Sequence, residues 1–124
     1  MTDPVFALEP DIPRNARVAR WLLFRLLNGL RGGSLTLREG AQTFQFGDAS
    51  AALHAEVQVL SPGVYWRILI GGSLAAAEAW MDGDWDTPHL TLLLELIARN
   101  SQILGQLEKG FRLLGKPVER LRHW

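Results

Sequence analysis

Cysteine is absent from the 124 residues. The chain therefore has no disulfide framework, no thiolate metal site and no cysteine nucleophile. It also lacks an apolar run of the ~20 residues that span a bilayer, because Glu95 interrupts the longest candidate, Leu90–Ala98. Its first fifteen residues have neither the basic nor the apolar region of a secretory signal. These absences predict a cytoplasmic protein.

Charge of one sign is missing from long stretches of the chain. Arg14–Arg31 contains five arginines and no acid, whereas Ser73–Glu95 contains five acids and no lysine or arginine. Arg99–Trp124 is basic again, with six cationic residues against two acids. Such segregation concerns surfaces and partners rather than the fold. The acidic middle would repel phosphate and no binding module surrounds the basic residues, so no nucleic-acid partner is expected.

Helical and alternating periods follow one another along the chain. Residues 14–31 repeat leucine and alanine at helical spacing and end at Gly32–Gly33. Apolar residues alternate over 35–38 and 43–46, with a turn signal between them, and alternate again over 53–59. The pattern predicts an α+β fold in which a small antiparallel sheet of about three strands packs against several helices.

Serine or threonine followed by proline marks two expected helix starts. Ser61–Pro62 and Thr87–Pro88 each combine an N-cap residue with proline at the first helical position. Gly71–Gly72 is expected to end the first of these helices, and Ser73 to cap the next one. The expected helices after the sheet are therefore 64–70, 74–81, 88 to about 104, and 107–114.

The acidic connector Asp82–Asp86 is the first candidate site. A calcium loop would need glycine at its sixth position and glutamate at its twelfth, where the chain has Thr87 and Leu93. Glu78 with one of the aspartates would form a carboxylate pair for a hydrolase, but nothing supplies the other catalytic parts. A turn whose acids favour the next helix N-terminus is the simpler interpretation. The connector contact candidates are Glu78, Asp82, Asp84 and Asp86.

Histidine, serine and glycine indicate no further site. His54, His89 and His123 do not have the spacing of a metal-binding pair. No serine lies in a nucleophile elbow, and neither glycine pair continues into a dinucleotide or phosphate loop. We therefore expect no metal, no cofactor and no catalytic residue in this segment.

Helix 14–31 is expected to carry an unusual face. Its arginines lie on one arc of about 140°, opposite the leucine stripe, and the same arc contains two large aromatic residues. The face could dock on an anionic membrane surface or pack against another domain. Isolated exposed aromatics, or a core that extends further around the helix, would need no function. The contact candidates are Arg17, Arg20, Trp21 and Phe24, with Trp66, Trp80 and Trp85 as candidate walls of the core or of a cavity.

The segment Gly71–Asn100 resembles the N-terminal domain of cyclopropane-fatty-acyl-phospholipid synthases. The similar run is a glycine, a small-residue helix ending in glutamate and an aromatic, then Met-Asp-Gly, Trp-Asp and an apolar helix. The basic helix, the Ser34–Leu37 strand and the aromatic-containing Val64–Ile70 also match the family's order, so the resemblance spans nearly the whole chain. The residues that carry it are Gly72, Glu78, Trp80, Met81, Asp82, Gly83, Trp85 and Asp86.

The resemblance implies a methyltransferase as the parent enzyme. Such an enzyme transfers a methylene group from S-adenosylmethionine to the double bond of an unsaturated phospholipid acyl chain, and related members methylate that bond instead. The family's cofactor loop and catalytic residues lie in a C-terminal domain. The present segment would then be non-catalytic and would handle lipid, in an arrangement similar to sterol-carrier-protein lipid binders.

The resemblance also implies partners and boundaries. The partners would be a phospholipid or acyl chain, an anionic membrane surface at the inner face of the membrane, and the catalytic methyltransferase domain; a homodimer stays open. A module that makes only domain or subunit contacts, without lipid, is the alternative. We expect an extended arm at 1–13, one lipid-handling domain at 14–116, and the start of a linker to a missing catalytic domain at 117–124.

Overall fold

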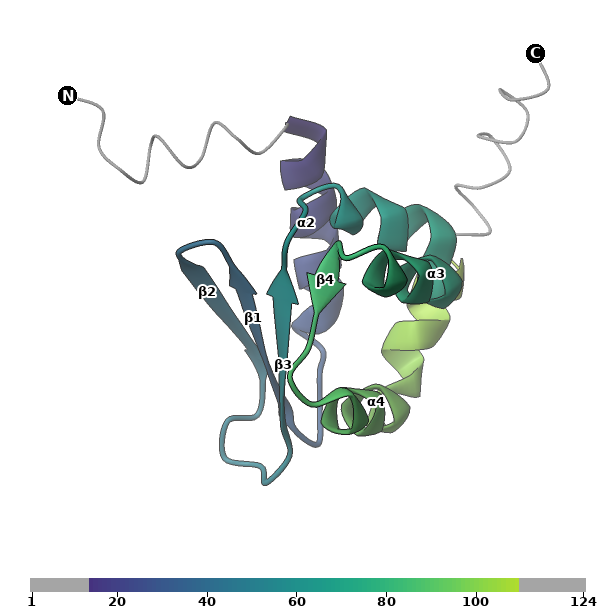
Figure 1. The fold of residues 1–124 in the computed structure, drawn as a ribbon. Coiled ribbons are helices and arrows are strands. Elements are labelled where there is room, and N and C mark those ends of the chain that lie inside the picture. The colour runs from purple at the N-terminus through teal and green to yellow at the C-terminus, as the bar shows by residue number, and fades with distance from the viewer. Residues whose placement is uncertain (1–13, 110–124) are drawn as a thin grey trace, which may run out of the picture.

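The computed structural model describes residues 14–109. The expected arm 1–13, the linker 117–124, His123 and the end of the expected helix 107–114 lie outside the described residues. The elements in chain order are α2 (Arg14–Leu27), β1 (Ser34–Glu39), β2 (Gln42–Gly47), β3 (His54–Val59), α3 (Val64–Met81), β4 (Trp85–Asp86) and α4 (Leu90–Arg99) (Figure 1). Residues 101–109 are helical as well.

The sheet is mixed, with the strand order β2-β1-β3-β4. The α+β class is therefore confirmed, and so is the β1–β2 hairpin. The expectation of an antiparallel sheet of three strands is wrong in two respects. Strand β3 pairs with β1 in parallel, and the connector contributes β4 antiparallel to β3. Alternation specifies which side chains share a face of a strand, but it does not specify the neighbouring strand or its direction.

One face of the sheet is covered and the other is polar. Leu35 and Leu37 of β1 and Ala55 and Val59 of β3 are buried, and α2, α3 and α4 lie on their side of the sheet (Figure 1). The intervening residues point to the uncovered face, where Arg38 pairs with Glu56 at 3.2 Å and Ser34 Oγ lies 2.5 Å from His54 Nδ1. The hydrophobic core is therefore a single layer between the sheet and the helices.

Helix α2 ends at Leu27, four residues before the expected end at Arg31. Tertiary contacts explain the difference. The side chain of Asn100 accepts a hydrogen bond from Arg31 N at 2.7 Å and donates one to Arg31 O at 2.8 Å. Both backbone groups of Arg31 are thus satisfied by a residue 69 positions away, so continued helix is not needed to pair them.

Helix α3 contains the break that its glycine pair predicts. Gly72 has φ 66° and ψ −149° in the middle of the helix, a conformation that only glycine adopts readily. The expected caps are wrong. Gly63, rather than Ser61, precedes the helix and makes no side-chain cap, and Ser73 N at the second half is capped by the carboxylate of Glu108.

Helix α4 is shorter than expected at both ends. It begins at Leu90, because the Thr87 hydroxyl donates to Glu56 O at 2.6 Å and ties the connector to β3 instead of capping the helix. It ends at Arg99, because Asn100 leaves helical geometry to bind Arg31. None of the described helices is long and apolar enough to cross a membrane.

Candidate functional site

The helices and the sheet enclose an apolar cavity of about 570 Å³. Its floor is the covered face of β1 and β3, and its walls come from α2, α3, α4 and the helical residues 101–109. The volume lies within the range of ligand pockets, roughly 300–1,000 Å³. Representative lining residues are Leu27 of α2, Leu37 of β1, Val57 and Val59 of β3, Ile68 of α3, Leu93 and Leu96 of α4, and Ile103 and Leu107 of the last helix.

The polar side chains that line the cavity have partners elsewhere. The Tyr65 hydroxyl donates to Glu39, Trp85 Nε1 donates to Ala76 O at 2.8 Å, and the Asn100 amide also donates to Leu96 O at 2.8 Å. The lining therefore presents hydrocarbon to whatever occupies it. A polar occupant would lose its hydrogen bonds to water without replacement.

The cavity opens between α3 and α4. Trp80 on α3 and Leu94 on α4 both line it, yet they are 40% and 54% exposed. Leu90 and Ile97, one turn to either side of Leu94, combine the same two properties. The mouth is thus rimmed by large apolar side chains, which is unusual for a surface that contacts only water.

The three candidate tryptophans have different positions. Trp80 and Trp85 line the cavity with ring centroids 6.5 Å apart, and Trp80 Nε1 donates to Asp86 Oδ1 at 3.1 Å. Trp66 lies outside the lining and packs against the core. The pair on the connector side is therefore part of the cavity wall, and Asp86 orients the exposed ring.

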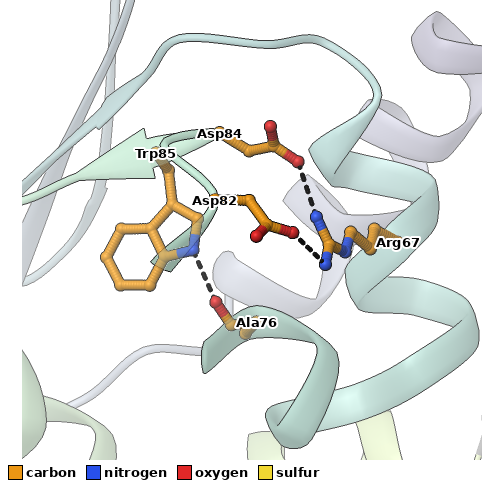
Figure 2. A network of polar contacts seen from close by, with 5 residues as sticks. All are labelled: Arg67, Ala76, Asp82, Asp84 and Trp85. Carbon is orange, nitrogen blue, oxygen red and sulfur yellow. Dashed lines mark hydrogen bonds and ion pairs between the residues drawn. The ribbon is translucent and has the colours of Figure 1, made fainter. Parts of the chain in front are cut away.

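The acidic connector is closed by an arginine that the sequence pattern did not single out. Arg67 Nη2 donates to Asp82 Oδ2 at 2.6 Å, and Arg67 Nη1 donates to Asp84 Oδ2 at 3.0 Å (Figure 2). The bonds to Asp82 and then Asp84 raise the pKa of Arg67 above its ordinary value. Both carboxylates are thus engaged by a cation on α3, which supports the turn interpretation over a hydrolytic pair. Glu78 is exposed on the same helix.

The expected arginine and aromatic face of α2 is divided between core and surface. Phe24 packs against the rings of Phe44 and Phe46, with centroids 4.9 and 4.8 Å away. Arg20 donates to Glu39 at 3.3 Å and lies 5.5 Å from the centroid of Phe44. The placement of Arg20 and Phe24 on an exposed face is therefore wrong, because the core extends around this side of the helix.

A smaller exposed face remains on α2. Trp21 is 57% exposed, and the guanidinium of Arg25 lies 5.1 Å from its ring centroid. Arg17, Val18 and Leu22 are exposed beside it. At 100° per residue these five residues share one arc, and we call them the outer face of α2.

A buried polar cluster lies beneath α2, and it too escaped notice in the sequence. Glu39 is 9% exposed and accepts hydrogen bonds from Arg20 and Tyr65, while its Oε2 has no partner within residues 14–109. Burial, followed by the bond to Glu39, raises the pKa of the Tyr65 hydroxyl well above its ordinary value. The parity of β1 could have revealed Glu39, because Leu35, Leu37 and Glu39 alternate onto one face.

Metal and cofactor groups find no matching site within residues 14–109. No three histidine or acidic side chains there lie close enough to hold a metal ion. S-adenosylmethionine, which the resemblance implies for the parent enzyme, does not fit the cavity, because its charged groups and its adenine need hydrogen-bond partners that the lining lacks. No family model, curated protein or solved structure matches the chain.

Proposed function

We propose that this domain binds a hydrocarbon chain, such as the acyl chain of a phospholipid, in the cavity between its sheet and its helices. The observation that carries the proposal is a ligand-sized cavity whose polar side chains are all paired away from it. Each methylene group moved from water into such a cavity contributes about 0.8 kcal/mol. An acyl chain can use the whole surface, since it needs shape and apolar area and no hydrogen-bond partner.

The wider proposal is that the domain is the non-catalytic N-terminal part of a cyclopropane-fatty-acyl-phospholipid synthase. The Gly72–Asp86 run supports it through the resemblance, and the cavity supports it through chemistry, since the substrate of such an enzyme is a phospholipid acyl chain. Methylene transfer from S-adenosylmethionine would then belong to a separate catalytic domain. The role of residues 14–109 would be to hold the acyl chain near that domain.

The outer face of α2 supports peripheral docking on an anionic membrane. Arg17 and Arg25 offer positive charge, and Trp21, Val18 and Leu22 offer apolar area beside it. A basic residue near such a surface contributes about 1 kcal/mol, and indole rings favour the interfacial region. This face and the cavity would together place an acyl chain and its bilayer against the same domain.

Binding can be tested by titrating the protein with a fluorescent fatty acid and by native mass spectrometry with oleate. Ala77→Trp should weaken binding strongly, because Ala77 is an exposed lining residue and a tryptophan there would plug the mouth. Glu78→Trp places the same ring one residue away, outside the lining, and should bind as the unsubstituted protein does. If the unsubstituted protein binds neither probe, the proposal is wrong.

A module that only contacts another domain is the second candidate. The uncovered face of the sheet favours it, since the exposed Arg38–Glu56 pair and the exposed His54 form a polar surface without a helix over it. Adding the fragment to an isolated catalytic domain should then restore activity, even in the Ala77→Trp variant. Loss of activity in that variant would favour the acyl-chain proposal instead.

A further inference from the structure

The last described helix, residues 101–109, is at once a wall of the cavity and a partner of α3. Ile103, Leu104 and Leu107 of this helix line the cavity. From the following turn, Glu108 Oε1 accepts hydrogen bonds from Ser73 N at 3.0 Å and from Ser73 Oγ at 2.8 Å. The wall is therefore attached to α3 by a polar contact, which we call the latch.

The latch sits at the break in α3. The positive φ of Gly72 interrupts the helix, so Ser73 begins a second half whose N–H groups need acceptors. The Glu108 carboxylate supplies one and places a negative charge at a helix N-terminus, where it is favoured. A Cβ on Gly72 would lie 2.7 Å from Glu108 Oε1, so the absent side chain makes room for the carboxylate. Gly72 and Ser73 also line the cavity, so the latch lies at its edge.

The opposite end of the same helix is held differently. Asn100 separates it from α4 with φ −124° and ψ 48° and is only 2% exposed. The Asn100 side chain bonds both backbone groups of Arg31 and the carbonyl of Leu96. One end is thus a buried, fully paired pivot, and the other is an exposed contact whose hydrogen bonds water can replace.

We propose that residues 101–109 form a gate of the cavity, pivoting at Asn100 and closed by the Glu108–Ser73 latch. Opening the latch leaves no buried polar group unpaired, whereas opening at Asn100 would leave several. Local opening follows such weakly held edges. The inference rests on the proposed function for the nature of the ligand, but the movement itself can be measured without any ligand.

The absence of cysteine allows a direct test of access. Val59→Cys places one thiol on the buried floor of the cavity, where it can report how fast N-ethylmaleimide reaches the interior. Adding Glu108→Ala should speed labelling about tenfold, as expected when charge-assisted hydrogen bonds are lost. Gln106→Ala, an exposed position on the same helix outside the lining, should leave the rate unchanged. Equal rates in the two variants would overturn the gate.

Global unfolding can be separated from gating by a matched control. Val18→Gly weakens α2 far from the latch, so labelling that proceeds through unfolding would accelerate in this variant as well. The gate predicts acceleration only with Glu108→Ala and Ser73→Ala. Equal acceleration with Val18→Gly, at matched stability in urea, would overturn it.

Ligand exchange gives the second measurement. In stopped-flow experiments with the fluorescent fatty acid, Glu108→Ala should raise the entry and exit rates by similar factors, of about tenfold, and leave the dissociation constant within about twofold. A rise in the exit rate alone would mean that the wall is lost rather than opened, and would overturn the gate. Absence of equilibrium binding to the unsubstituted protein would instead contradict the proposed function, and the thiol labelling would still decide the gate.

Discussion

Arg20 on α2 donates a hydrogen bond from Nη1 to Oε1 of Glu39, 3.3 Å away at the end of β1. The two residues are 15% and 9% exposed, so the pair joins the first helix to the hairpin in a mostly buried setting. The rings of Phe24 and Phe44 lie against the same guanidinium. The contact shows that a basic residue from the arginine-rich helix serves the fold.

Arg20→Met should lower the free energy of unfolding by about 3 kcal/mol, because it leaves the buried Glu39 carboxylate without its cation. Urea unfolding measures the change. Arg17→Met, on the exposed outer face, should stay within about 0.5 kcal/mol of the unsubstituted protein. The double variant Arg20→Met/Glu39→Leu should regain part of the loss, and no recovery there would argue against a buried-charge cause.

Tyr65 predicts a loss of stability at alkaline pH. Its raised pKa means that the folded state holds the hydroxyl proton more tightly than the unfolded state does. This stabilisation is complete below the unfolded pKa of about 10, and it is lost as the pH rises from there towards the folded-state pKa. Tyr65→Phe should remove this part of the pH dependence and cost about 1 kcal/mol at neutral pH.

The tyrosine signal can be followed without interference, because the chain has a single tyrosine. In the folded protein, tyrosinate absorbance should stay low through pH ~10 and should rise together with the loss of tryptophan fluorescence anisotropy on unfolding. A titration near pH ~10 in the folded protein would contradict the buried placement.

Two glycine-to-alanine substitutions should have opposite effects. Gly72→Ala should destabilise the protein by roughly 1–3 kcal/mol, since it strains a backbone at φ 66° and directs a Cβ at Glu108. Gly105→Ala meets no atom within 4 Å and lies in helical residues, so it should stabilise by about 1 kcal/mol. Thermal unfolding of the two variants, side by side, tests this. The same sign for both would refute the assignment of the kink.

Membrane docking should depend on the outer face of α2. At low salt the protein should float with anionic vesicles and not with zwitterionic ones, and raised salt should release it. Trp21→Ala combined with Arg25→Ser should abolish flotation. Arg38→Ser removes an exposed arginine from the uncovered face of the sheet and should have little effect. Equal losses in both variants would point to general charge rather than this face.

Local features of the chain could be read from the residues alone. The β1–β2 hairpin, the third strand and the break at Gly71–Gly72 follow from alternation and from the conformational freedom of glycine, which depend on near neighbours in the chain. The α+β class follows from the same periods. Helix ends were less predictable, since Asn100 and Thr87 use their side chains on distant backbone groups.

The candidate site could be predicted only in part. Trp80 and Trp85 were expected as walls and line the cavity, whereas Phe24 and Arg20 were expected at the surface and lie in the core. A helical wheel identifies residues on a common arc, but it does not reveal how far a neighbouring sheet covers that arc. Arg67 was overlooked because its aspartate partners are 15 and 17 residues away in sequence.

The sequence by itself determined the absence of thiol chemistry, the segregation of charge, and the order of helices and strands. Tertiary structure alone decided that β3 pairs with β1, that Arg20 turns inward onto Glu39, and that five elements enclose one apolar space. The physical reason is the range of the interactions. Propensity and periodicity act over a few residues, whereas strand pairing, burial and the space left between packed elements depend on segments far apart in the chain.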